Sequence, residues 1–189
     1  MTVGIFGGSF DPIHSGHVGI ARRAIEEFQL DRLIVIPAAV SPFKTDHAPQ
    51  AFGYDRLALV KAAFAGLDKV VVDDRELRRG GVSYAIDTVR EIRAELAQDD
   101  TLIFLIGEDS VAGLPRWKDY DALVKLCTFK SFPRTRESST EVRRRLQAGE
   151  PINDLVPPAV ADLIASPVSG AAAGGASRGC GASRPLWRA

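Results

Sequence analysis

The first seventeen residues constrain the fold most strongly. A short apolar run at residues 3–6 is typical of a buried β-strand. It ends at Gly7 and Gly8, where a backbone without Cβ atoms can turn sharply and approach a ligand closely. An apolar stretch with helical spacing follows at about residues 16–28. The chain therefore begins with a strand, a glycine turn and a helix, which is the repeating unit of a parallel α/β sheet.

The same alternation continues along the chain. Apolar runs that suit buried strands recur at residues 33–37, 70–72 and 102–106, and helical spacing recurs at about residues 54–65, 84–97 and 114–126. This pattern predicts an α/β fold with a doubly wound parallel sheet and helices on both faces. Ligands of such sheets bind beyond the carboxyl ends of the strands, so the residues after Gly7, Pro37 and Gly107 are candidate site residues.

Two histidines, His14 and His17, flank Gly16 at the expected start of the first helix. A helix N-terminus already favours an anion, because its N–H groups are unpaired and its dipole is positive there. Two imidazoles would add donors for a polyphosphate. The second interpretation is a metal site. Structural zinc usually needs four protein ligands, whereas the chain has three histidines and two distant cysteines, Cys127 and Cys180, so the pattern favours a phosphate site.

Composition argues against several classes of protein. Lysine plus arginine and aspartate plus glutamate both number 24, so no overall basic field attracts a nucleic acid. No apolar run reaches the length of a membrane span, and the first residues do not resemble a signal peptide. Two cysteines among 189 residues are too few for a disulfide framework. We therefore expect a cytoplasmic protein without a membrane or nucleic-acid partner; the oligomeric state stays open.

The chain changes character near Ser166. Residues 166–189 are rich in glycine, alanine and serine and show no apolar periodicity. Such a segment cannot bury enough surface to offset the entropy lost on ordering. We therefore expect one domain at residues 1–165 and a flexible tail at residues 166–189.

The run Gly-Gly-Ser-Phe-Asp-Pro-Ile-His-Ser-Gly-His at residues 7–17 resembles the signature of the nucleotidyltransferase superfamily with the His-x-Gly-His motif. Within that superfamily the chain is most similar to the bacterial nicotinate-mononucleotide adenylyltransferases. The resemblance implies a Rossmann-like fold and adenylyl transfer from ATP to nicotinate mononucleotide in NAD biosynthesis. The products would be nicotinate adenine dinucleotide and pyrophosphate. Mg²⁺ would arrive with ATP, since the sequence has no carboxylate cluster to hold it.

The resemblance also implies which residues hold ATP. By itself the segment Ser138 to Arg143 is more typical of a plain helix capping box, but it matches the superfamily's Ser-Ser-Thr-x-x-Arg motif in the right order along the chain, which favours phosphate binding. Lys44 matches a Pro-Pro-His-Lys segment, from which Ser41 and Phe43 depart, and Arg56 is a weaker match. The catalytic candidates are His14, His17, Lys44 and Arg143; the ATP-binding candidates are Gly7, Gly8, Ser9, Phe10, His14, His17, Ser139, Thr140 and Arg143.

The acceptor candidates come from two further segments. Residues 83–88 resemble the family's Ser-Tyr-Thr-x-Asp-Thr run, with Ala85 in place of threonine, and residues 107–117 resemble its Gly-x-Asp…Leu-x-x-Trp pattern. Backbone N–H groups of the first segment would bind the nicotinate carboxylate. Trp117 would stack on the pyridine ring, although a tryptophan is otherwise more often a packing residue. The acceptor-binding candidates are Ser83, Tyr84, Ala85, Gly107, Asp109 and Trp117.

The chain departs from the family between residues 130 and 137, where the connection to the Ser-Ser-Thr motif is shorter than usual. Eight residues span at most about 25–29 Å, so the chain can close the gap, but we expect one strand of the family's sheet to be missing. This departure leaves two alternatives to the expected activity. The acceptor could be another molecule such as phosphopantetheine, or the chain could be a catalytically impaired nucleotide-binding module.

Overall fold

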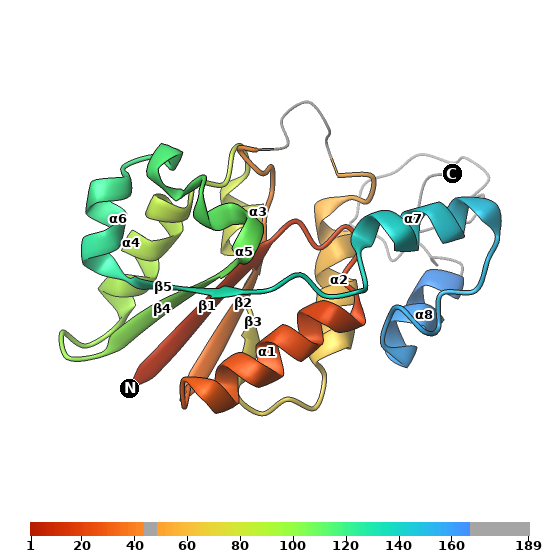
Figure 1. Cartoon of the computed structure of the whole chain (residues 1–189), viewed down its shortest axis with the longest axis horizontal. Helices are drawn as coiled ribbons and strands as arrows, with labels where there is room; N and C mark the ends of the chain where they lie inside the picture. Colours follow the sequence, from red (N-terminus) through yellow and green to blue (C-terminus); the bar gives the residue numbers. More distant parts are fainter. Residues whose placement is uncertain (44–48, 167–189) are drawn as a thin grey trace, which may run out of the picture.

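The structure is a computed structural model that describes residues 1–43 and 49–166. Its centre is a five-stranded sheet in the order β3-β2-β1-β4-β5, with every neighbouring pair parallel (Figure 1). The strands are β1 (Thr2–Gly8), β2 (Arg32–Pro37), β3 (Val70–Val72), β4 (Thr101–Gly107) and β5 (Thr128–Phe132). The predicted parallel α/β sheet is confirmed, and β5 is a strand that the sequence patterns did not indicate.

Helices follow most of the strands, as the alternation predicted. The helices are α1 (Ser15–Glu27), α2 (Gly53–Phe64), α3 (Arg75–Arg79), α4 (Ala85–Glu95), α5 (Glu108–Val111), α6 (Tyr120–Leu126), α7 (Ser139–Ala148) and α8 (Pro158–Ala165), with a 3-10 turn, η1, at Leu114–Arg116. Among the described residues, none of these helices is long and apolar enough to span a bilayer.

The two faces of the sheet bury separate hydrophobic cores, because successive side chains of a strand point to opposite faces. Phe6 and Val35 pack on one face with residues of α1, α2, α7 and α8. Ile5 and Ile34 pack on the other face with residues of α4 and α6. The sheet is thus covered on both sides (Figure 1), which is why its central strands are apolar throughout.

The register brings the ends of the strands to one edge. Gly8 lies beside Pro37, and Phe6 lies beside Leu105, so the carboxyl ends of β1, β2 and β4 meet there. The loops that leave these strands therefore share one surface, which is the expected ligand edge of a parallel sheet.

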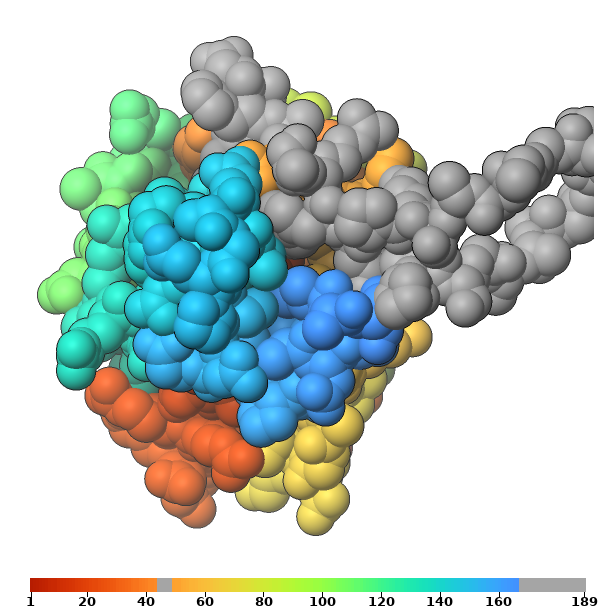
Figure 2. Space-filling view, turned by 90° about the vertical axis from the view of Figure 1, so that its right-hand side faces the viewer, coloured from red at the N-terminus to blue at the C-terminus, as the bar shows by residue number. Residues whose placement is uncertain are grey.

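The final two helices cover the end of the molecule beside α1. Figure 2 shows α7 and α8 side by side, with α1 next to them. The backbone N–H of Ser15, the first residue of α1, donates to the carbonyl of Leu155 at 2.8 Å. Val142 of α7 and Val160 of α8 are fully buried in the core that α1 shares. This packing places the N-terminus of α7 against the N-terminus of α1.

The short connection from β5 to α7 runs over the start of α1. Within the part of the chain that the structure describes, no strand lies between β5 and α7. Thr135 of this connection rests directly on Gly16: a Cβ atom at Gly16 would lie 2.0 Å from Oγ1 and 2.8 Å from Cβ of Thr135. Gly16 is therefore required by close approach of the two segments.

Substitution of Gly16 by alanine tests this contact. Gly16→Ala should destabilise the fold by about 1–3 kcal/mol through overpacking, although alanine favours a helix over glycine by about 1 kcal/mol. The double variant Gly16→Ala/Thr135→Gly should recover most of that loss. Urea unfolding measures both. Equal stability of Gly16→Ala and wild type would show that Thr135 does not pack as described.

Candidate active site

A cleft of about 640 Å³ opens at the carboxyl edge of the sheet. Its floor is formed by the ends of β1 and β4, including Gly7, Gly8 and Gly107. Ser9, the start of α4 and Trp117 also line it. The predicted acceptor residues Ser83, Tyr84, Ala85, Gly107, Asp109 and Trp117 all line this cleft, together with Gly7, Gly8 and Ser9.

Buried contacts and hydrogen bonds hold the loop from β1 to α1 in place. Phe10 adopts a left-handed backbone with φ of 45°, and its buried ring packs against Phe6 and His17 with centroid distances of 5.6 and 5.1 Å. The carboxylate of Asp11 accepts backbone N–H groups from Gln50 and Ala51 at 3.0 and 3.1 Å. Asp11 thus shapes the loop rather than facing solvent, as its turn chemistry suggests.

A buried arginine fastens this loop to β2. Arg56 of α2 has an exposed fraction of 1%. Its guanidinium donates to the carbonyl of Ser9 at 2.5 Å and to those of Ala38 and Ala39 at 2.7 and 3.5 Å. Burial lowers the pKa of Arg56, and the nearby Asp11 opposes that effect. The residue ties together the loops after β1 and β2, one on each side of the cleft floor.

The two histidines lie together at the start of α1. Their ring centroids are 3.7 Å apart, and the backbone N–H of His14 donates to Nδ1 of His17 at 3.2 Å. An imidazole nitrogen that accepts a hydrogen bond carries no proton, so neutral His17 holds its proton on Nε2. The His17 ring therefore accepts from the backbone at the start of α1, as one half of a capping box with His14.

Burial determines the charge of His14. Its exposed fraction is 7%, and loss of hydration lowers its pKa to about 4, against an opposing effect of the Glu137 carboxylate. At neutral pH His14 is therefore uncharged, and its buried Nδ1 makes no hydrogen bond within the described residues.

The start of α7 completes this side of the site. Ser138 caps the helix, since its hydroxyl accepts the backbone N–H of Glu141 at 3.2 Å. The Ser139 hydroxyl donates to the carbonyl of Pro12 at 2.9 Å. Arg143 donates to the carbonyl of Asp11 at 2.7 Å and to the hydroxyl of Thr140 at 3.2 Å. The motif thus supplies a serine N-cap for α7 and also lies against the histidine loop.

The acceptor side presents a helix N-terminus and an aromatic wall. Tyr84 is the N-cap residue of α4, and within the described residues its side chain makes no capping hydrogen bond. Trp117 is half-buried and contacts Phe43, Phe104 and Phe129 at centroid distances of 5.9, 5.9 and 5.8 Å. Trp117 therefore packs against neighbouring aromatic rings and also lines the cleft. Its position is compatible with both predicted roles, as a packing residue and as a wall for a bound ring.

Two predicted residues need separate comment. Lys44 lies outside the described residues. Asp109 is exposed and lies 3.7 Å from Nε of Arg134 at the end of β5. Sequence patterns did not indicate Glu76, a buried carboxylate in the cleft wall. The sequence carries no signal for Glu76, because a glutamate in the charged run Arg-Glu-Leu-Arg-Arg is typical of an exposed position.

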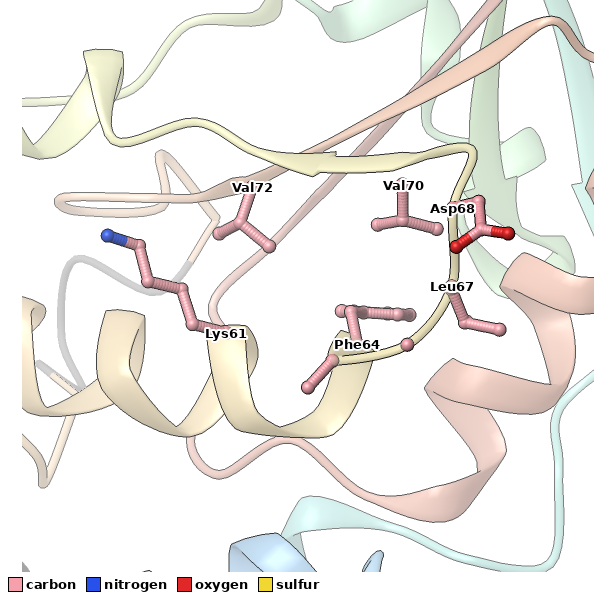
Figure 3. Close-up of a pocket in the computed structure, with 8 residues that line it drawn as sticks. Lys61, Phe64, Leu67, Asp68, Val70 and Val72 are labelled. Atoms are coloured by element: carbon pink, nitrogen blue, oxygen red, sulfur yellow. The ribbon is translucent and has the colours of Figure 1, made fainter.

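A second hollow lies away from this site. It measures about 430 Å³ and is formed by the end of α2, the following turn and β3 (Figure 3). Because that turn leads into β3, the hollow lies at the amino end of the strand, opposite the ligand edge. Its lining includes the apolar side chains of Phe64, Leu67 and Val70, with Lys61 and Asp68 as its charged groups. The residues that line this hollow form no cluster suited to catalysis.

The described residues also contain no metal-binding cluster. Within residues 1–43 and 49–166, no group of three or more histidine, cysteine, aspartate or glutamate side chains lies close enough to hold an ion. The Asp11 carboxylate already accepts two backbone N–H groups. A divalent cation at this site would therefore depend on ligands from a bound substrate.

A glycine floor, a helix-capping histidine pair and a cleft at the strand ends define a nucleotide-binding α/β protein. The family model for cytidylyltransferase-like proteins matches residues 5–158. A Gemmatimonas aurantiaca protein named probable nicotinate-nucleotide adenylyltransferase is 39% identical over 194 residues, covering 88% of this chain and 90% of its own. The chain belongs to the nicotinate-nucleotide adenylyltransferase family within the cytidylyltransferase-like proteins.

Solved structures agree with this assignment at the level of the fold. A Vibrio parahaemolyticus structure assigned to the nicotinate-nucleotide adenylyltransferases superposes with a TM-score of 0.71 at 22% identity, covering 86% of this chain and 97% of that one. Plasmodium falciparum nicotinic acid mononucleotide adenylyltransferase complexed with NaAD superposes with a TM-score of 0.64 at 18% identity, covering 85% and 93%. The expected Rossmann-like nucleotidyltransferase fold is confirmed.

Removal of the Arg56 guanidinium should lower the stability of the fold. Arg56→Met keeps much of the side-chain volume but leaves the buried carbonyls of Ser9 and Ala38 without donors. Each unpaired buried group costs about 1–3 kcal/mol, so the free energy of unfolding should fall by about 2–5 kcal/mol. Arg22→Met, at an exposed position of α1, should change it by less than about 0.5 kcal/mol. Similar urea midpoints for the two variants would contradict the role of Arg56.

Acid titration should reveal the buried state of His14. Its pKa of about 4 in the folded chain lies below about 6.5 for an unfolded histidine. Between these values the unfolded state binds more protons, so stability falls as the pH falls through this window. The histidine should contribute about 3 kcal/mol to that fall. His14→Gln should reduce the slope of stability against pH between 6.5 and 4, measured by urea unfolding; parallel curves for the two proteins would refute it.

Proposed function

We propose that the protein transfers the adenylyl group of ATP to nicotinate mononucleotide, producing nicotinate adenine dinucleotide and pyrophosphate. The observation that carries this proposal is the meeting of two unlike surfaces at Gly7, Gly8 and Ser9. On one side lie the histidine loop and the start of α7, which are rich in donors. On the other side lies the cleft with its helix N-terminus and aromatic wall. A nucleotide triphosphate fits the first, and an aromatic acid fits the second.

The reaction requires positioning and charge stabilisation and no covalent enzyme intermediate. An oxygen of the acceptor's 5′-phosphate forms a bond to the α-phosphorus of ATP, while the bond from that phosphorus to the bridging oxygen of pyrophosphate breaks. The bond electrons leave with pyrophosphate, so negative charge grows on the leaving group. Donors fixed in advance around that charge lower the barrier.

Residues of the histidine loop and of α7 supply those donors. His14 and His17 lie stacked at the helix start, with His17 holding its proton on Nε2. Arg143 and Thr140 lie beside them, tied to the carbonyl of Asp11 and to each other. We assign the α- and β-phosphates to the histidines and the leaving pyrophosphate to Arg143, with Ser139 and Thr140 at the start of α7. Lys44 is assigned a supporting phosphate contact.

Magnesium enters with ATP in this proposal. The phosphates would supply most of its ligands, because Mg²⁺ keeps several waters and commonly binds substrate oxygens. Mg²⁺ would neutralise charge on the triphosphate, while this chain's residues orient it. The nucleotidyltransferase family generally uses the ion in this way.

The acceptor would lie along the cleft. Its carboxylate would accept backbone N–H groups at the start of α4, where the helix dipole favours an anion. Its pyridine ring would contact Trp117, and its ribose Asp109. The Gemmatimonas and Plasmodium relatives, which are named for this substrate class, support the choice of acceptor.

A pyrophosphate-release assay with alternative acceptors tests the activity. With ATP and Mg²⁺, release should be fastest with nicotinate mononucleotide, because the carboxylate matches the start of α4. It should be at least about tenfold slower with the nicotinamide form, since one charge-assisted contact is worth about 1.5–3 kcal/mol. Phosphopantetheine should give none. Turnover only with phosphopantetheine would contradict the acceptor, and ATP binding by calorimetry without any turnover would favour the nucleotide-binding module.

Substitution of His17 tests the phosphate assignment. His17→Ala should lower kcat by about 10²–10⁴-fold, the usual effect of losing a fixed donor to developing charge. Gly19→Ala on the same helix is the matched control, because a Cβ atom there meets nothing within 4 Å. Circular dichroism and urea unfolding confirm that both variants are folded. An unchanged rate in folded His17→Ala would remove the histidine from the mechanism.

A further inference from the structure

Glu76 of α3 is a buried carboxylate in the wall of the cleft. Its exposed fraction is 7%, and it lies beside Ser83, Tyr84 and Ala85 in the cleft lining. A buried carboxylate is costly unless it is hydrogen-bonded. In the assignment of roles above, no reacting group or substrate contact uses it.

The hydrogen bonds of Glu76 all lead to α4 and to the segment just before it. The Thr88 hydroxyl of α4 donates to Glu76 Oε1 at 2.6 Å and accepts from Arg79 at 2.8 Å. The hydroxyl of Ser83 interacts with the same carboxylate. Arg79 Nη2 lies 4.0 Å from Glu76 Oε1 and offsets part of its charge. Glu76 thus joins α3 to both sides of the first turn of α4.

Ser83 extends this network to the floor of the cleft. Its hydroxyl oxygen accepts the backbone N–H of Ala39 at 3.0 Å, and its own N–H donates to the carbonyl of Val40 at 2.8 Å. Because the oxygen is already an acceptor toward Ala39, its hydrogen is available to point at Glu76. The carboxylate therefore sets the direction of the Ser83 hydroxyl and of the segment that leads into α4.

The loop before Ser83 needs such an anchor. Gly80 and Gly81 both have left-handed backbones, with φ of 68° and 67°. Glycine has the largest conformational freedom to lose on ordering. Tyr84, the N-cap residue of α4, makes no side-chain capping hydrogen bond among the described residues. Without a cap, the position of these N–H groups depends on the segments to which Ser83 and Thr88 are bonded.

We propose that Glu76 is a positioning residue for the acceptor, fixing the start of α4 so that its backbone N–H groups are aligned with the acceptor's anionic group. This inference rests on the proposed function. Glu76 does not touch the reacting phosphates, so its loss weakens binding of the acceptor equally in the ground and transition states. Such a change raises the KM of the acceptor and leaves kcat unchanged.

The test compares steady-state constants of Glu76→Gln with those of wild type. Glutamine keeps the shape but replaces one acceptor oxygen by an NH₂ group, so either Ser83 or Thr88 loses its acceptor. The KM for nicotinate mononucleotide should rise about tenfold, which corresponds to one lost hydrogen bond, while kcat and the KM for ATP stay within about twofold. Calorimetry with nicotinate mononucleotide alone should show the same loss of affinity.

Thr88 provides a second route if Glu76→Gln fails to fold. Thr88→Val removes the hydroxyl at constant shape and should raise the acceptor KM, whereas Thr88→Ser retains the hydroxyl and should restore it. Glu95→Gln, an exposed acid of α4 that pairs with Arg75, is the control and should leave every constant unchanged.

The outcomes separate the two proposals. Wild type that releases no pyrophosphate with nicotinate mononucleotide contradicts the proposed function. Active wild type overturns the role of Glu76 if the folded Glu76→Gln or Thr88→Val variants change both KM values equally, lower kcat alone, or change nothing.

Discussion

The arrangement of this site depends on one buried cation. Arg56 reaches from α2 under the ends of two neighbouring strands and donates to the carbonyls that follow each of them. A parallel sheet leaves the carbonyls at its carboxyl edge without partners from the ladder, and a buried carbonyl without a donor is costly. A single guanidinium satisfies several of them, because it carries five N–H donors in a rigid plane. Arg56 thereby holds the loops after β1 and β2 in a fixed position relative to each other.

Two polar networks begin at the loops that Arg56 holds together. Toward the histidines, the loop continues through Asp11, whose backbone carbonyl accepts from Arg143 of α7. Toward the acceptor side, Ala39 donates to Ser83, which leads to Glu76 and Thr88. The buried polar residues of the described chain are thus concentrated beneath the cleft. Adenylyl transfer by positioning requires such a rigid floor, because errors of about 1 Å between reacting groups cost large factors in rate.

Sequence patterns predicted the parts of this structure that have a period or a motif. The apolar runs of β1, β2 and β4 are long and buried, so their existence and the glycines after them could be read directly. β5 was missed because Thr-Phe-Lys-Ser-Phe is mostly exposed and has no continuous apolar run. The short α3 was missed because five charged and apolar residues do not establish a helical period. The family resemblance indicated the two acceptor segments. That both segments line one cleft became visible only in the fold.

The burial of Arg56 and Glu76 could not be predicted from sequence, because charged residues of helices are usually exposed; the resemblance marked Arg56 only as a weak match for a phosphate site. Their roles arise from tertiary placement: Arg56 lies under two strand ends, and Glu76 faces a hydroxyl from the next helix. The short connection at residues 130–137 raised the opposite problem. It left open a catalytically impaired module, yet Ser139 and Arg143 at the start of α7 bond directly to the carbonyls of Pro12 and Asp11. The packing of Thr135 on Gly16 explains how the chain closes this distance.

The central claim is that the loop after β1 holds a nucleotide triphosphate between α1 and α7. The most direct measurement is a crystal structure of the protein with a non-hydrolysable ATP analogue and Mg²⁺. The account predicts phosphate oxygens within hydrogen-bonding distance of the imidazoles of His14 and His17 and of the start of α7. Phosphates bound elsewhere, with both imidazoles remote from them, would contradict it.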